Sequence, residues 1–176
     1  MFGTTGNGWL FSLSDDSDWG SSDWGSVDKF YRSIYGDMRN SELDEKGRFL
    51  VDHRVYGTRR SYEYEPVAGD GFAFYHSTRA TFPKNDEFKR KARISLMGEL
   101  VEMQFAADEP RKINRICVSV SQKALEQFPY YPIVRNDSTK NLFEDCGITK
   151  GPIATLYYAP KTVWEQFVEE VGFDIA

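Results

Sequence analysis

Histidine and cysteine are scarce in this sequence: its 176 residues include only His53, His76, Cys117 and Cys146. Two cysteines are too few for a disulfide scaffold, and no C-x-x-C or H-x₃₋₅-H pair is present to build a zinc site. The chain also lacks the G-x-S-x-G motif of serine hydrolases and the glycine-rich loops that hold nucleotide phosphates. We therefore expect no catalytic residue, no metal and no cofactor, although a histidine-dependent triad stays arithmetically open.

Long apolar runs are missing as well. No segment approaches the roughly 18–20 apolar residues of a membrane span, and residues 1–13 lack the basic start and apolar block of a signal peptide. We therefore expect no membrane association, a cytoplasmic setting, and one domain over residues 1–176. Positive charge is also in deficit, with 22 Lys and Arg against 27 Asp and Glu. A net charge of −5 disfavours indiscriminate coating of nucleic acid but allows a local basic patch.

The apolar pattern predicts several short strands and a few short helices. The expected strands are Gly8–Leu13, Arg48–Tyr56 with Gly57 as its stop, Phe72–His76, Ala92–Phe105 with a bulge or bend at Gly98, Ile113–Val120 and Ile153–Tyr158. The expected helices are Lys29–Tyr35, Ser121–Phe128 with Ser121 as its cap, and a final helix that Pro160 opens and Gly172 closes. Because this order does not alternate strand and helix, it predicts an α+β fold: a curved, mostly antiparallel sheet or small β-barrel with flanking helices.

Aromatic residues are abundant, with four Trp, ten Tyr and thirteen Phe. Most of them lie on periodic apolar faces and are expected in the core. Trp19 and Trp24 differ, because they lie in a loop rich in Ser, Gly and Asp that has no apolar periodicity. Large aromatics in loops are typical of surfaces that stack on bases, and an aromatic box with acids can instead hold a cation.

Basic residues gather in three local clusters despite the acidic total. The residues expected to contact phosphates are Arg60, Lys84, Lys89, Arg90, Lys91, Arg93, Arg111, Lys112 and Arg115. If the sheet curls, these clusters could converge and follow a nucleic-acid backbone. Any one of them taken alone is also consistent with an ordinary solvated surface.

Four segments resemble the EVE domain, a member of the PUA-like superfamily that also includes YTH and ASCH domains. Trp9–Ser12 (WLFS) resembles the family's W-[LI]-x-[KS] opening, and Val55–Arg60 (VYGTRR) occupies the place of its W/V-x-G-x-R-x segment. The most specific match is Ala68–Ser77 (AGDGFAFYHS), which resembles the GD-x-[VL]-x-[FL]-Y-H-S strand. Gly98–Val101 (GELV) stands where the family has GEVV. The resemblance is strongest over residues 68–101.

The resemblance implies a small barrel-like fold with a pocket that binds nucleic acid carrying a modified base. The implied pocket residues are Trp9, Ser12, Tyr56, Arg59, Tyr75, His76 and Ser77, with Trp19 or Trp24 closing an aromatic cage. A base flipped out of its stack is typically held in this way. Two features depart from the family pattern: the long insert Thr78–Arg93 and the acidic loop that carries the two tryptophans.

The sequence therefore predicts a non-catalytic reader that binds DNA or RNA and recognises a modified base, with a separate nuclease or other effector as a potential partner. Two alternatives stay open. One is a small hydrolase of ASCH type, for which Thr58, Lys91 and Glu99 are available. The other is a protein-interaction module whose acidic tryptophan loop binds a cationic partner.

Overall fold

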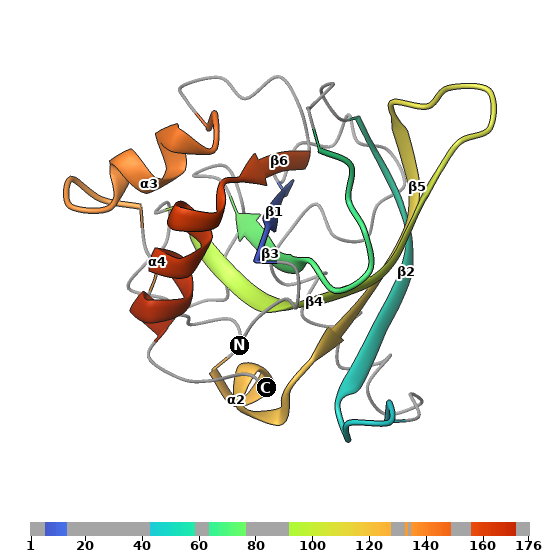
Figure 1. Cartoon of the computed structure of the whole chain (residues 1–176), viewed down its shortest axis with the longest axis horizontal. Helices are drawn as coiled ribbons and strands as arrows, with labels where there is room; N and C mark the ends of the chain where they lie inside the picture. Colours follow the sequence, from blue (N-terminus) through green and yellow to red (C-terminus); the bar gives the residue numbers. More distant parts are fainter. Residues whose placement is uncertain are drawn as a thin grey trace, which may run out of the picture.

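The structure is a computed structural model, and it describes residues 6–13, 43–58, 64–76, 92–127, 133, 135–148 and 156–171. Along the chain these residues form β1 (Gly8–Leu13), β2 (Phe49–Thr58), β3 (Gly71–His76), β4 (Arg93–Phe105), β5 (Lys112–Val120), α2 (Gln122–Gln127), α3 (Lys140–Asp145), β6 (Leu156–Ala159) and α4 (Lys161–Val171). Figure 1 shows the strands curving away from α3 and α4.

The six strands form one mixed sheet in the order β2-β5-β4-β3-β1-β6. β1 runs parallel to β3, and the other neighbouring strands are antiparallel. The α+β class is therefore confirmed. The sheet order ends on β2 and β6, so the described strands make an open sheet, and the closed barrel that the sequence left as an option is not formed by them. At the start of β4, hydrogen bonds from Ile94 N to Ile133 O (3.0 Å) and from Arg135 N to Ala92 O (2.8 Å) add a further short segment beside it.

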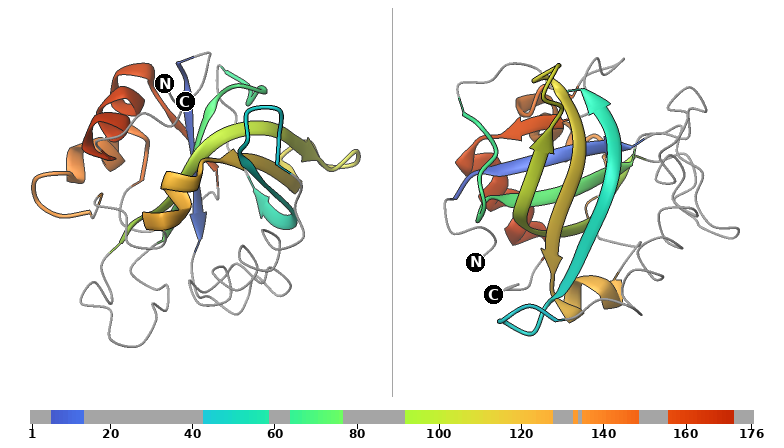
Figure 2. Two further views of the ribbon diagram at one scale, coloured as in Figure 1. Left: turned by 90° about the horizontal axis from the view of Figure 1, so that it is seen from below. Right: turned by 90° about the vertical axis from the view of Figure 1, so that its right-hand side faces the viewer.

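The sheet is curled because its pairing slips by one residue at several points. Register shifts occur between Phe74 and Tyr75 in the β3–β4 pair, twice in the β4–β5 pair, and before Gly57 in the β2–β5 pair. Such bulges bend a strand and increase its twist. As a result, β2, β5 and β4 cross in front of β1 and β3 in the right-hand view of Figure 2.

The two faces of the β3-β1-β6 half are buried in different ways. Residues two apart along a strand share a face. One face, which we call the inner face, carries rings that pack on one another: Phe11 and Phe74 have centroids 6.2 Å apart, and Phe72 and Phe74 are 5.2 Å apart. The opposite face, which we call the helix face, packs against α3 and α4, where Phe143 and Phe167 meet at 5.3 Å.

Trp164 of α4 lies flat over two glycines of the helix face. Gly8 and Gly71 are register partners in the parallel β1–β3 pair, and a Cβ atom at either position would come within 3.0 Å of the indole. Only glycine therefore allows α4 to approach the sheet so closely. Trp164 is 1% exposed, so this contact also closes the core on that side.

Most predicted elements are confirmed, and the errors occur where glycines and loops had to be interpreted. The predicted first strand matches β1, and Ser121 caps α2 by accepting a hydrogen bond from Ala124 N (3.1 Å). Gly57 does not stop β2, which continues to Thr58 across a bulge. Gly98 is no bulge: β5 passes so near it that a Cβ would come within 3.0 Å of the Ser119 carbonyl oxygen.

The helices show one difference from the prediction and one prediction that the structure does not describe. α3 lies in a segment where the sequence pattern predicts no helix. The expected helix Lys29–Tyr35 lies outside the described residues. No helix in the described part of the chain is long and apolar enough to cross a membrane.

Candidate functional site

A tight turn connects the loop before β3 to the buried Trp9. In the turn Val67–Asp70, Asp70 N donates to Val67 O (3.1 Å), and Gly69 supplies the positive φ of 93° that such a turn needs at its third position. The Asp70 side chain is 1% exposed. Its Oδ2 atom accepts one hydrogen bond from Val67 N (3.0 Å) and one from the indole Nε1 of Trp9 (2.8 Å).

Three aromatic rings lead from this buried contact to the surface. The ring centroids of Trp9 and Tyr158 are 5.2 Å apart, and Tyr64 stacks on Tyr158 at 5.1 Å with an interplanar angle of 29°. The Tyr158 hydroxyl donates to Asn7 Oδ1 (3.1 Å), which fixes the middle ring. Trp9 is fully buried, whereas Tyr64 is 46% exposed. We call Trp9, Tyr158 and Tyr64 the aromatic ladder.

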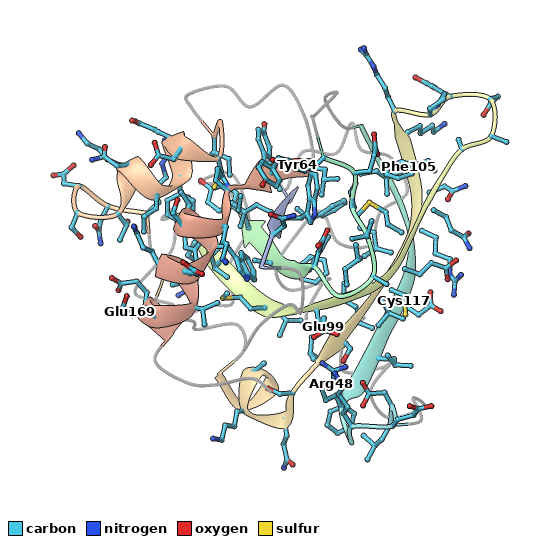
Figure 3. All side chains as sticks on the ribbon, in the orientation of Figure 1. Arg48, Tyr64, Glu99, Phe105, Cys117 and Glu169 are labelled. Atoms are coloured by element: carbon cyan, nitrogen blue, oxygen red, sulfur yellow. The ribbon has the colours of Figure 1, made fainter. Side chains whose placement is uncertain are left out.

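Other apolar side chains of the turn and of β4 are not fully buried. Val67 is half exposed in the turn after Tyr64, and Val101 is exposed where a register shift in the β4–β5 pair leaves it in a bulge. Met103 and Phe105 of β4 are partly buried against the core. Figure 3 shows Tyr64 and Phe105 near the upper end of the curled sheet, and it shows Arg48 and Glu99 near the lower end. The upper end is therefore the candidate site.

Tyr64, Tyr158 and Asn7 were not identified from the sequence. Tyr64 lies in a segment without apolar periodicity, two residues before Pro66, and its neighbour in the ladder comes from a strand more than ninety residues later. The ladder depends on the pairing of β6 with β1, which places Tyr158 opposite Trp9. The only local signal is a large aromatic residue in a polar loop.

The predicted base-pocket residues that the structure describes fall on different faces of the sheet. Trp9 lies on the inner face with no exposed surface. Ser12 is the register partner of Tyr75, three residues along from Trp9 and therefore on the helix face. Tyr75 is buried against Phe143 at a centroid distance of 5.2 Å. The structure therefore brings Trp9 to Tyr158 and Tyr64, and does not bring it to Ser12 or Tyr75.

The remaining predicted pocket residues that the structure describes belong to β2 and β3. Tyr56 lies in β2 and His76 ends β3, with only their backbones described. The residues outside the described part of the chain are Trp19, Trp24, Arg59 and Ser77.

Tyr75 belongs to a buried polar contact with Arg135. The guanidinium Nη1 of Arg135 lies 3.5 Å from the Tyr75 hydroxyl, and its Nη2 donates to Ile148 O (3.3 Å). Burial raises the pKa of Tyr75 above its usual value, although the hydrogen bond and charge of Arg135 act in the opposite direction. The hydroxyl is therefore protonated at neutral pH, and this contact ties β3 to the segment before α3.

Two of the predicted phosphate contacts, Arg93 and Arg115, are respectively buried and paired with carboxylates at the surface of the sheet. Arg93 is 0% exposed, so its side chain cannot meet a phosphate at the surface, which corrects the prediction for that residue. Arg115 binds both carboxylate oxygens of Asp52 (2.8 and 2.6 Å) and also Glu102 (3.0 Å). The hydrogen bonds and charge of Asp52 raise the pKa of Arg115 further above its usual value. Its positive charge is therefore largely balanced within the sheet.

The other basic residues divide into two sets. Arg111 and Lys112 lie where the β4–β5 hairpin returns into β5, next to Asp108 and Glu109, so this tip is of mixed charge. Figure 1 and the right-hand view of Figure 2 show this hairpin at the upper end of the sheet. The predicted phosphate contacts outside the described part of the chain are Arg60, Lys84, Lys89, Arg90 and Lys91.

The residues of the hydrolase alternative are not assembled. Thr58 pairs with Lys112 and Glu99 pairs with Ser119, seven residues further along β5. At about 3.3 Å per residue, the backbones of Thr58 and Glu99 are roughly 23 Å apart. Glu99 is also in an ion pair with Arg48 (3.5 Å). Lys91 lies outside the described residues.

Both cysteines are buried free thiols. Burial raises the pKa of Cys117 to about 11, with a further contribution from the nearby Asp52 carboxylate, and burial raises that of Cys146 as well. Neither thiol is a ready nucleophile at neutral pH. Among the described residues, no group of three His, Cys, Asp or Glu side chains is placed to hold a metal ion.

No protein-family model, curated protein or solved structure matched the chain.

Proposed function

We propose that this protein is a nucleic-acid-binding reader and that Tyr64 is the platform on which an unpaired base stacks. The observation that carries the proposal is the combination of exposure and order at Tyr64, which is 46% exposed while its ring lies stacked on Tyr158. A flexible surface tyrosine loses conformational freedom when it binds a base. A ring already held in place loses less, and stacking is worth about 1–3 kcal/mol per base.

Arg111 and Lys112 are the described cations that we expect to accompany a stacked base, since the β4–β5 hairpin and Tyr64 both lie toward the upper end of the molecule in the view of Figure 3. Each phosphate contact to a single strand lowers the slope of log K against log salt by about 0.7. Two contacts predict a slope of about −1.4. A steeper slope would indicate further phosphate contacts. The predicted candidates for these contacts are Lys84, Lys89 and the basic residues next to them.

The resemblance to EVE domains adds two finer elements to the proposal. The first is that the recognised base is modified, as expected when a flipped base is held between aromatics. The second is a PUA-like architecture, which the curled sheet and the helices on one of its faces support. An experimental structure with β2 and β6 approaching one another would favour the barrel, and a flat sheet would argue against it.

The test is a fluorescence-anisotropy titration with labelled single strands of RNA and DNA, each prepared plain and with methylated adenine or cytosine. We expect the wild-type protein to bind at least one strand and Y64A to bind it roughly 5- to 150-fold more weakly, the range that corresponds to one lost stacking contact. Y64F keeps the ring and should bind within about threefold of wild type.

Leu43→Ala is the matched control, because Leu43 is another exposed apolar side chain, 55% exposed, just before β2. It should leave binding unchanged. Absence of binding to every strand, or equal affinities of wild type and Y64A, would contradict the proposal. A preference for a methylated strand would support recognition of a modified base, and equal affinities for plain and methylated strands would contradict it.

A further inference from the structure

Asp70 closes a ring of contacts that includes the exposed Tyr64. Starting from Oδ2, the ring passes to Trp9 through the indole hydrogen bond (2.8 Å), to Tyr158 through packing at 5.2 Å, and to Tyr64 through stacking at 5.1 Å. It returns along the chain to Val67, whose N–H donates to the same Oδ2 atom (3.0 Å). One carboxyl oxygen therefore connects both ends of the path.

The return along the chain is short and stiff. Only Glu65 and Pro66 separate Tyr64 from Val67. Proline fixes its own φ and favours an extended conformation of the residue before it, so the position of Val67 restricts where Tyr64 can lie. The turn itself is fastened to β4, since Gly69 N donates to Leu100 O (2.8 Å) and Leu100 N donates to Asp70 O (2.7 Å).

The two hydrogen bonds of Asp70 act on Tyr64 from opposite sides. The bond from Val67 holds the loop that carries Tyr64, and the bond from Trp9 holds the ring on which the ladder is built. Asp70 is 1% exposed and its bond from Trp9 is buried, which makes that bond stronger than a surface contact, whereas the bond from Val67 is partly buried. Asp70 itself cannot reach a ligand at the surface.

We propose that Asp70 is a positioning residue that orders the Tyr64 ring for ligand binding by linking Val67 to the buried indole of Trp9. This inference rests on the proposed function where binding is concerned. It also makes a claim about the free protein: without Asp70, the Tyr64 ring loses its fixed stacking on Tyr158.

The first measurement is fluorine NMR of protein labelled with 3-fluorotyrosine, in which the Tyr64 signal is assigned by its disappearance in Y64F. We expect a shifted Tyr64 signal in wild type, because the neighbouring Tyr158 ring perturbs it. In D70A the signal should move to the position of an exposed, averaged tyrosine, and D70N should restore it because an amide oxygen can accept both bonds.

Two further variants complete the test. W9F removes the indole donor and keeps a smaller aromatic ring at that position, so it covers the case in which D70A does not fold, and it should move the Tyr64 signal in the same direction. Asp44→Ala is the matched control, since Asp44 is another partly buried aspartate that accepts hydrogen bonds, here from Arg48 and Ser119 near the opposite end of the sheet. It should leave the Tyr64 signal unchanged.

The second measurement is a double-mutant cycle on oligonucleotide affinity. We expect D70A to weaken binding about fivefold in the wild-type background and by less than twofold when Tyr64 is already alanine. A purely structural role would produce equal losses in both backgrounds. Unchanged Tyr64 signals in D70A and W9F would overturn the positioning role while leaving the proposed function intact. Shifted signals combined with equal affinities of wild type and Y64A would retain the positioning role and overturn the function.

Discussion

Replacing Gly71 with alanine tests the contact that sets the distance between α4 and the sheet. A methyl group at this position would come within 3.0 Å of the six-membered ring and nitrogen of the Trp164 indole, so the ring would have to move by roughly 1 Å. Because Trp164 is buried and packed against Phe167, that movement disturbs the core. Inserting a methyl group into a packed core typically costs about 1–3 kcal/mol, and the severity of this clash predicts about 3 kcal/mol.

The assay is urea unfolding followed by circular dichroism, with the free energy taken by linear extrapolation. Gly47→Ala is the control, because Gly47 has open space around it and only the strain of its positive φ of 72° is expected, about 1–2 kcal/mol. The stronger test is a cycle with W164F. Phenylalanine lacks the atoms that a methyl at Gly71 would meet, so the cost of G71A should fall by at least about 1 kcal/mol in the W164F background.

Gly8 gives an internal comparison for the same cycle. A methyl at Gly8 would meet Cγ and neighbouring atoms near the root of the indole, and phenylalanine keeps a ring there. W164F should therefore rescue G8A less than G71A. Equal stability of G71A and wild type, or the same cost of G71A in both backgrounds, would refute the packing described for α4.

Two further predictions concern titratable groups. Partial burial raises the pKa of Asp44, but hydrogen bonds from Arg48 and Ser119 outweigh it and lower the pKa below 3.8. Its contribution to stability is therefore complete above that value and is lost as pH falls through the lower folded-state pKa. D44N should cost about 1–2 kcal/mol at pH 7 and progressively less below about pH 4, measured by urea unfolding; a cost that does not change with pH would contradict this. The buried thiols of Cys117 and Cys146 should react with a disulfide reagent at pH 8 more than about tenfold more slowly in the native protein than in urea, and equal rates would contradict their burial.

The sequence predicts strands well here because their apolar residues alternate or run together between glycines and polar turns. β1 and β3 are recovered almost to the residue, and the cap of α2 follows from Ser121. The parallel pairing of β1 with β3 could not be predicted, since it joins strands more than fifty residues apart and places Gly8 beside Gly71 under Trp164. Local patterns carry no information on such a contact.

The site was harder to predict than the fold for a similar reason. The sequence draws attention to Trp9, but the surroundings of Trp9 depend on the register between β1 and β6, which places Tyr158 beside it. Charge clusters were misleading where partners come from other strands: Arg115 is basic in the sequence but meets Asp52 and Glu102 across the sheet. Arg93 is likewise buried by tertiary packing that its basic neighbours do not reveal.

The most direct test of the central claim is photo-crosslinking of a bound single strand carrying 4-thiouridine, followed by mass spectrometry of the crosslinked peptides. A base stacked on the exposed ring lies in contact with Tyr64, so the account predicts a crosslink on the peptide that contains Tyr64, lost in Y64A and kept in L43A. Crosslinks found only elsewhere, with the Tyr64 peptide unmodified at saturating strand, would contradict it.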